Sequence, residues 1–411
     1  MLRRLNGFQL ILAATAVSGV AGYLVTWLVY RQIGAAPYAI FAIFWAALFL
    51  VVGGLSGIQQ EITRATQPVR SQPRKQRHEA RNFGLALAVI VFVLIVATAF
   101  SWATAVFQDL GWSLVWPLAV GAGCYVLVAT LGGSLYGLSN WRPLAVMIVA
   151  DGVLRLALLV LVLAMTHDPV VLAWAVALPF PLVILLLWPF IRTGLAGRSV
   201  IDVDVKTLSW NVSRTVLASI SSAVLISGFP LVLGVFGQAE EPAVLGELIF
   251  AITLARAPLI IIALSLQSYF VVQFRDRAAT WWKSFLQVQG IILGGGVVIA
   301  VLGWLFGPAL FGWISGQPVT LGGTYFAIMA VSSALVAALC VSAPAVLARS
   351  QHVAYSLGWA IAAIATVAVM LLPMEFMSKV ALALILGPAA GLLVHLAALL
   401  HQRQIRQRLF L

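Results

Sequence analysis

Residues 83–107, FGLALAVIVFVLIVATAFSWATAVF, contain no Asp, Glu, Lys or Arg. As a helix, a run of this length crosses the ~30 Å hydrocarbon core of a bilayer, which takes roughly 20 residues. The whole chain has the same character, because 63% of its 411 residues are apolar and only 9% are charged. A soluble domain carries about 25% charged residues. The composition predicts a polytopic membrane protein and excludes a soluble enzyme and a DNA-binding protein. It also excludes a secreted disulfide-linked domain, because the chain has only two Cys residues, Cys124 and Cys340, and both lie in apolar runs.

About twelve apolar runs follow one another along the chain, so we expect an all-α fold of about twelve transmembrane helices. The loop near 191–208 divides them into two sets of six. We therefore predict two six-helix lobes, 1–200 and 201–411, around a central cavity, which is a usual architecture for alternating access. The runs lie near 8–29, 38–60, 83–107, 113–137, 143–166, 171–190, 209–236, 245–272, 284–312, 322–347, 354–372 and 379–400.

The chain has a net charge of +12, and the positions of its basic residues indicate how it is oriented in the membrane. With the amino terminus in the cytoplasm, nineteen Lys and Arg residues lie in cytoplasmic loops or ends, whereas Arg31 and Lys379 lie outside. This asymmetry follows the positive-inside rule. We predict a multi-pass protein of the cytoplasmic (inner) membrane with both termini cytoplasmic. No nucleic-acid partner is expected, while the basic stretch 64–81 could also contact anionic lipid headgroups.

The sequence lacks the signatures of several chemical functions. It has no GxxxxGK[ST] phosphate-binding loop, no cluster of metal ligands and no nucleophile beside a base, and its five His residues are scattered. The predicted outer loops are too short to hold the sugar donor of a glycosyltransferase. We therefore expect neither an enzyme nor a cofactor. By elimination we expect the protein to move a substrate without making or breaking bonds.

The first helix of each predicted lobe carries polar or small residues at steps of three and four, which place them on one face. Such a face fits either a water-filled cavity or close packing against another helix. In the first run these residues are Thr15, Ser18, Gly22 and Thr26, and in the seventh they are Asn211, Thr215, Ser219 and Ser222, with Arg214 alongside.

Ionisable residues at membrane depth face a cavity or a partner. Arg256 is predicted near mid-bilayer, where it would bind an anion or form a buried ion pair. Asp151 and Arg155 are four residues apart, so they could neutralise each other or couple transport to an ion. Glu247, a third ion-coupling candidate, could instead be solvated near the outer end of its helix. Nine residues place it on the opposite helix face from Arg256.

Several short stretches together resemble a known family. They are GIQQEITR at 57–64, ARAP at 255–258, and Gln267. With the twelve-helix pattern, they make the chain similar to the Wzx-type polysaccharide and oligosaccharide-lipid flippases of the multidrug/oligosaccharidyl-lipid/polysaccharide exporter superfamily. The resemblance implies a V-shaped pair of lobes that moves a polyprenyl-diphosphate-linked oligosaccharide between leaflets. It implies that Arg256, and after it Arg214 and Arg64, would hold the diphosphate. We predict Gln60, Asn211 and Gln267 as further substrate-binding residues.

Two other functions remain open. A cation-coupled exporter of drugs or metabolites from the same superfamily would need an acidic cavity. A non-transporting scaffold for glycan assembly would need no substrate path. In the flippase interpretation the partners are the lipid-linked glycan, membrane lipids and, as a further expectation, a glycan polymerase or glycosyltransferases.

An Arg64 and Glu61 pair, three residues apart, could be a solvated local pair or part of a cationic cavity.

Overall fold

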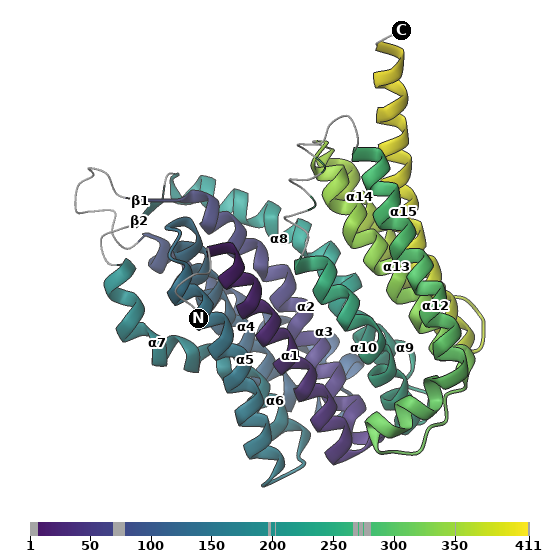
Figure 1. Ribbon diagram of the computed structural model, residues 1–411. Helices are drawn as coiled ribbons and strands as arrows, with labels where there is room; N and C mark the ends of the chain where they lie inside the picture. Colours follow the sequence, from purple (N-terminus) through teal and green to yellow (C-terminus); the bar gives the residue numbers. More distant parts are fainter. Residues whose placement is uncertain are drawn as a thin grey trace. The chain divides into compact units, whose positions relative to one another are not determined.

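The computed structural model describes residues 7–68, 79–195, 199–201, 203–265, 270, 274, 281–349 and 351–409. Within these ranges the chain is almost entirely helical (Figure 1). The helices are α1 Gly7–Ile33, α2 Ala35–Ala65, α3 Glu79–Phe107, α4 Gly111–Gly137, α5 Trp141–Leu163, α6 Pro169–Ala177, α7 Pro179–Leu195, α8 Val205–Ser227, α9 Phe229–Phe236, α10 Pro242–Ser265, α12 Trp281–Ser315, α13 Gly323–Leu347, α14 His352–Met370 and α15 Phe376–Leu409.

Nine stretches of helix in the described ranges are long and apolar enough to cross a membrane, and the bent pair α8 and α9 would make a tenth. One of the nine, residues 80–137, is two helices that pack against each other. Gly84 of α3 faces Thr130 of α4, while Phe92 contacts Trp116, so the two helices run antiparallel. Helix occupies part of each of the twelve predicted runs, and the prediction of an all-α polytopic membrane protein is confirmed.

Two predicted spans are interrupted. The run near 171–190 contains α6 and α7, which meet at Leu178 and Pro179, and a proline at this point interrupts a helix. The run near 209–236 is not one continuous helix, because α8 and α9 meet at Gly228 with a bend of 69°. Pro230 lies in the first turn of α9. Backbone N–H groups in the first turn of a helix have no intrahelical acceptor, so the missing N–H of Pro230 costs no hydrogen bond there.

A short antiparallel ladder joins two predicted cytoplasmic loops. Strand β1, Thr66–Pro68, continues from α2 and pairs with strand β2, Ser199–Ile201, which follows α7. Because the two strands are hydrogen-bonded, the chain must cross the membrane an even number of times between them. The α3 and α4 hairpin, α5, and the broken span α6 and α7 provide four crossings, which agrees with the predicted topology of this part.

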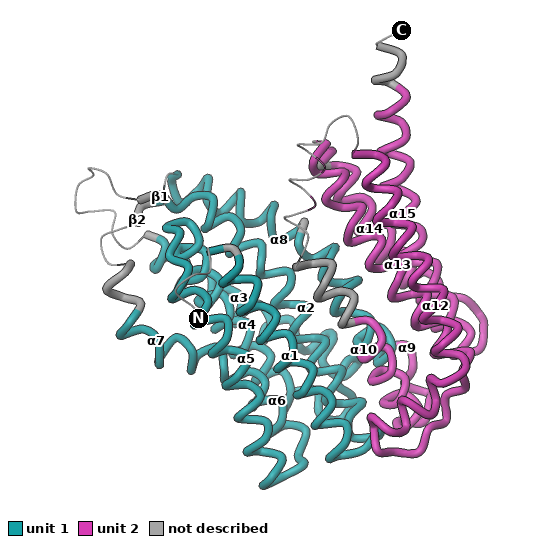
Figure 2. The backbone as a smooth tube through the Cα atoms, in the orientation of Figure 1, with its two compact units in different colours: residues 1–235 teal, residues 236–411 magenta. Residues whose placement is uncertain are grey.

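The chain divides into two compact units, Met1–Val235 and Phe236–Leu411, which Figure 2 colours separately and which we call unit 1 and unit 2. The sequence placed the division between the lobes near residue 200. The later division has a structural cause, since α8 packs along α2. Gly57 of α2 lies against the backbone of Thr215 and Val216, where any Cβ would overlap main-chain atoms. The α8 helix therefore belongs to unit 1 by its contacts.

Each unit has its own apolar core. In unit 1, α2, α4 and α8 bury a cluster that includes Ile58, Val126 and Val212. In unit 2, α13 contacts α10, α12, α14 and α15. Its residues Val341 and Val346 join a buried cluster with Phe285 of α12. Packing in these cores positions the helices that carry the polar residues of the candidate site.

Candidate functional site

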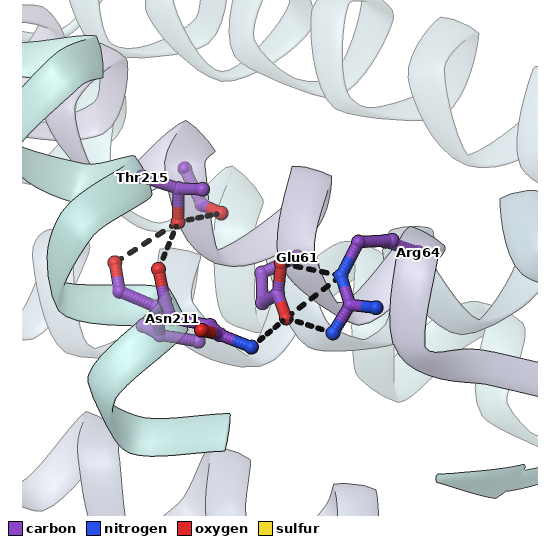
Figure 3. A network of polar contacts seen from close by, with 6 residues as sticks. Glu61, Arg64, Asn211 and Thr215 are labelled. Atoms are coloured by element: carbon purple, nitrogen blue, oxygen red, sulfur yellow. Dashed lines mark hydrogen bonds and ion pairs between the residues drawn. The ribbon is translucent and has the colours of Figure 1, made fainter. Parts of the chain in front are cut away.

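A network of polar contacts in unit 1 lies where the second half of α2 meets α8 (Figure 3). Glu61 and Arg64 are one turn apart on α2, so the carboxylate and guanidinium face each other. Arg64 Nε donates to Glu61 Oε2 at 2.9 Å, and Arg64 Nη2 donates to Glu61 Oε1. The Glu61 side chain is 5% exposed and that of Arg64 is 51% exposed. The pair therefore has a buried anionic end and an accessible cationic end.

The α8 helix completes this group from 150 residues further along the chain. Asn211 Nδ2 donates to Glu61 Oε1 at 3.0 Å. One turn later, the Thr215 hydroxyl lies 3.0 Å from the carbonyl oxygen of Gly57 and within 3.1 Å of the carbonyls of Asn211 and Val212. The absence of a side chain at Gly57 permits this approach. The interhelical contact thus fixes Glu61, which in turn orients Arg64.

Further polar side chains continue along the same helix pair. Gln60 is exposed, and its Nε2 lies 3.4 Å from the Ser219 hydroxyl. Arg214 is also exposed, one turn after Asn211 on α8. In the described part of the chain no carboxylate forms an ion pair with Arg214. The α2 and α8 pair therefore carries two exposed guanidiniums, of which Arg64 is paired with Glu61.

The amino-terminal end of α8 is fixed by its own cap. Asp204 accepts a hydrogen bond from the backbone N–H of Lys206 at 3.2 Å. The pKa of the exposed Asp204 carboxyl is lowered, chiefly because the Thr207 side chain donates a hydrogen bond to the carboxylate. An ionised carboxylate at this position also interacts favourably with the helix dipole. The cap sets where the helix that carries Asn211 and Arg214 begins.

Asp151 and Arg155 form a second charged pair in unit 1. Arg155 Nη1 and Nη2 donate to the two oxygens of Asp151 at 2.8 and 2.7 Å. The guanidinium also lies over the rings of Phe49 and Phe180, and Nε donates to the carbonyl oxygen of Val176. The Arg155 side chain is 6% exposed and that of Asp151 is 19% exposed. The sequence left neutralisation and ion coupling open, and the geometry is that of a mutually neutralised pair.

Arg256 of unit 2 is buried, with 4% of its surface exposed. Its Nη2 donates to the hydroxyl of Ser332 on α13 at 2.8 Å. This contact joins α10 to α13 inside unit 2. The guanidinium is therefore much less accessible than those of Arg64 and Arg214. The anion-binding role of Arg256 stays a prediction.

Glu247 is also buried, at 3% exposure, rather than solvated at the helix end. Its carboxylate accepts hydrogen bonds from the backbone N–H groups of Thr320 and Leu321 at 2.9 and 3.0 Å, and from the Thr320 hydroxyl at 2.6 Å. The acceptor thus anchors the segment that precedes α13 to α10. This arrangement explains Glu247 as a structural carboxylate, while its ion-coupling role stays a prediction.

The predicted site residues therefore fall into separate groups. Arg64, Gln60, Asn211 and Arg214 lie on the α2 and α8 pair of unit 1, Asp151 and Arg155 form a pair on α5, and Arg256 and Glu247 lie in unit 2. Gln267 lies outside the described residues. The sequence did not indicate Ser332 and Thr320 as partners, because nothing local marks a contact across more than seventy residues.

Solved structures with this fold cover nearly the whole chain. A lipid II flippase, MurJ, in an inward closed conformation aligns with a TM-score of 0.72 and 12% identity, over 94% of this chain and 86% of that chain. A multidrug resistance MATE family transporter of the MOP superfamily, in an inward-facing conformation, aligns with a TM-score of 0.63 and 14% identity, over 97% and 96% of the two chains.

The chain has the fold of the MOP superfamily transporters. Another such transporter, from Pyrococcus furiosus, aligns with a TM-score of 0.60 and 14% identity over 97% of this chain and 95% of its own. That protein is described as having a binding pocket of reverse polarity, which suggests a different function for it. Proteins with the MOP fold thus include ones described as drug transporters and one described as a lipid flippase.

Sequence relatives extend the comparison without adding a function. An uncharacterised protein of Mycobacterium tuberculosis is 29% identical over 94% of this chain and 90% of its own length. An uncharacterised protein of Mycobacterium bovis is 28% identical over 94% and 90% of the two chains. No protein-family model matches the chain.

Proposed function

We propose that this protein is a flippase that carries a polyprenyl-diphosphate-linked oligosaccharide across the cytoplasmic membrane by alternating access. The MOP fold supports a transporter, and fold alone does not select the substrate. The choice of an anionic head group rests on the charge of the α2 and α8 pair. Its exposed ionisable side chains include the guanidiniums of Arg64 and Arg214, whereas the Glu61 carboxylate is buried.

The single observation that carries the proposal is Arg214. It is exposed beside Asn211 and is not compensated by a carboxylate in the described ranges. A guanidinium offers a planar set of donors that matches two phosphate oxygens at once. Arg64 adds a second guanidinium whose orientation is set by Glu61 and, through it, by Asn211. These exposed guanidiniums, on two helices that pack together, suit a diphosphate.

The physical task is compatible with such a surface. A lipid-linked glycan has a charged head that cannot enter ~30 Å of hydrocarbon and a tail that need not leave it. A cationic surface holds the diphosphate while the tail stays in lipid. A cation-coupled drug exporter would instead need carboxylates accessible to a cationic substrate. In the described part of unit 1, Glu61 and Asp151 are engaged by Arg64 and Arg155.

The test is translocation in vesicles that contain the purified full chain. The probe is a fluorescently labelled polyprenyl-diphosphate oligosaccharide, and an impermeant reductant reports which leaflet holds the label. We expect wild type to move the probe, Arg214→Ala to be slower by about tenfold or more, and Arg214→Lys to retain part of the rate. Lys206→Ala, which removes an exposed cation of the same helix, is the matched control and should be unaffected.

Other outcomes would favour the other functions. Movement of a cationic dye but not of the glycan probe would favour the drug or metabolite exporter. A chain that moves neither probe in vesicles, yet supports surface glycan in cells with Arg214→Ala, would favour the scaffold. Equal rates for wild type and Arg214→Ala would remove Arg214 from the substrate site.

A further inference from the structure

His395 on α15 is a fully buried imidazole, with 0% of its surface exposed, at the meeting point of three helices of unit 2. Its Nδ1 lies 2.7 Å from the hydroxyl oxygen of Ser342 on α13. Its Nε2 lies 3.2 Å from the backbone carbonyl oxygen of Tyr355 on α14. Sequence reasoning gave this residue no role, because none of its partners lies nearby along the chain.

The two contacts define which nitrogen carries hydrogen. A carbonyl oxygen can only accept, so Nε2 must donate to Tyr355. The opposite neutral tautomer would point a lone pair of Nε2 at that oxygen. Nδ1 is therefore either a neutral nitrogen that accepts from the Ser342 hydroxyl or a protonated nitrogen that donates to it. The position of one proton distinguishes these two states.

Ser342 can serve both states because its hydroxyl has a second acceptor. The Ser342 oxygen lies 2.9 Å from the carbonyl oxygen of Leu339, one turn earlier on α13. When His395 is neutral, the single hydroxyl hydrogen points to Nδ1. When His395 is charged, Nδ1–H donates to the Ser342 oxygen and the hydroxyl hydrogen turns to Leu339. Rotation of one hydrogen thus accommodates the added proton, and every hydrogen-bonding group named here stays satisfied.

The space for the imidazole is provided by a glycine. At Gly358 of α14, one turn after Tyr355, a Cβ would overlap Nε2 and Cδ2 of the ring. The Tyr355 ring lies nearly parallel to the imidazole, at an interplanar angle of 11°. The site is therefore formed by α13, α14 and α15 together. A change in the charge of His395 acts on the contact among all three helices.

The described residues of α13, α14 and α15 contain no Asp or Glu. Two turns beyond Ser342, α13 is followed by Arg349, while α15 carries the exposed His401 and Arg403 beyond His395. The α14 helix presents Tyr355, whose phenol ionises only near pH 10 in water. Imidazole is the side chain whose ordinary pKa lies closest to neutrality.

We propose that His395 is a proton-binding site of unit 2 through which a proton gradient drives the transport cycle. The coupling part rests on the proposed transport function. Charge-assisted hydrogen bonds are about twice as strong as neutral ones. Protonation strengthens the bonds of His395 to α13 and α14, and deprotonation weakens them. A proton bound more tightly in one arrangement of these helices favours that arrangement.

The first test measures protonation directly and needs no substrate. The full chain is labelled with ¹³C and ¹⁵N histidine, reconstituted in bilayers and titrated by NMR, and His395→Gln identifies the signal. We expect the signal to convert reversibly from the Nε2–H tautomer to imidazolium between pH 8 and 4 in the folded protein. A neutral imidazole over this whole range, or the Nδ1–H tautomer, would overturn the proposal.

Variants sharpen the titration. Ser342→Ala removes the acceptor for the Nδ1–H of His395. The pH at which His395 is half protonated should therefore fall by about one unit, which is a tenfold loss of proton affinity. Gly358→Ala should shift the His395 signal by displacing the ring. His401→Gln is the matched control on the same helix and should leave the His395 titration unchanged. A Ser342→Ala protein with unaltered titration would contradict the hydroxyl switch.

The second test measures coupling in the same vesicles with the labelled lipid-diphosphate glycan. An imposed pH gradient should accelerate the wild type several-fold, whereas the rate of His395→Gln should not respond to the gradient. If wild type moves the probe but ignores the gradient, the coupling proposal fails and the flippase proposal stands. If wild type moves no probe, the flippase proposal and the coupling that rests on it fail, while the NMR titration still decides whether His395 binds a proton.

Discussion

In unit 1 the buried carboxylate of Glu61 faces the guanidinium of Arg64, whereas in unit 2 the buried carboxylate of Glu247 faces two backbone N–H groups and a hydroxyl. Glu61 and Glu247 are each at most 4% exposed as whole residues. The first depends on the charge of another side chain, and the second depends on the position of the segment around Thr320. The stability of unit 1 should therefore be most sensitive to changes of side-chain charge, and that of unit 2 to changes of backbone geometry.

The largest effect should come from breaking the second charged pair of unit 1. Asp151→Asn leaves the Arg155 guanidinium buried without its carboxylate, which should destabilise the protein by about 3 kcal/mol. The double variant Asp151→Leu, Arg155→Met removes both charges and should recover most of the loss. Unfolding of the purified protein in detergent measures both. Equal stability of Asp151→Asn and wild type would show that the pair does not support unit 1.

A smaller effect is expected when the carboxylate of unit 2 is neutralised. Glu247→Gln keeps one acceptor oxygen but places an NH₂ group where an acceptor received a hydrogen bond, which should cost about 1–3 kcal/mol. Thr320→Val removes one donor and keeps both backbone donors, so its effect should be smaller. The same unfolding assay applies. A loss for Glu247→Gln greater than that for Asp151→Asn would reverse the proposed contrast between the units.

Helix packing offers a third comparison, through glycines of the two units. Gly57→Ala places a Cβ against main-chain atoms of Thr215 and Val216, which cannot move as a side chain can, and overpacking of this kind costs about 1–3 kcal/mol. Gly294 of α12 has nothing within 4 Å of an added Cβ. Gly294→Ala should therefore be neutral or stabilise by up to about 1 kcal/mol. Similar losses in thermal scans would indicate that the α2 and α8 contact is not specially close.

The smallest effect should come from helix capping. Asp168 Oδ1 accepts from the backbone N–H groups of Val170 and Val171 at the start of α6, whereas the N-cap residue of α13, Gly322, makes no side-chain cap bond. Asp168→Ala should destabilise unit 1 by about 1 kcal/mol, and Asp168→Asn by less. Gly322→Ala, which loses no side-chain cap bond, is the comparison in unit 2. Thermal midpoints would register the difference, and a larger shift for Gly322→Ala would contradict it.

Much of the fold was predictable because it depends on local apolar length. The run 83–107 corresponds to α3, Glu79–Phe107, and 322–347 corresponds to α13, Gly323–Leu347, within a few residues. The break at Gly228 was not predicted, since the apolar character continues through it into α9. The assignment of α8 to unit 1 was not predicted either. It depends on a close approach at Gly57 that no composition reveals.

The candidate site was predictable where partners are close along the chain. The spacing of Asp151 and Arg155 indicated a pair, and three residues placed Arg64 beside Glu61. The contact from Asn211 to Glu61 spans 150 residues, and the one from Ser342 to His395 spans 53. Such contacts depend on which helices become neighbours, and the periodicity of a single helix carries no information about that choice.

The ladder between Thr66–Pro68 and Ser199–Ile201 also constrains the order of assembly. During synthesis the first strand emerges long before the second. Its backbone groups therefore have no partner strand until the intervening helices have been made and have entered the membrane. Domains generally mature from the amino terminus as they are made. The ribosome must therefore deliver the residues up to Ile201 before this ladder can form, and α8 and most of α9 follow to complete unit 1.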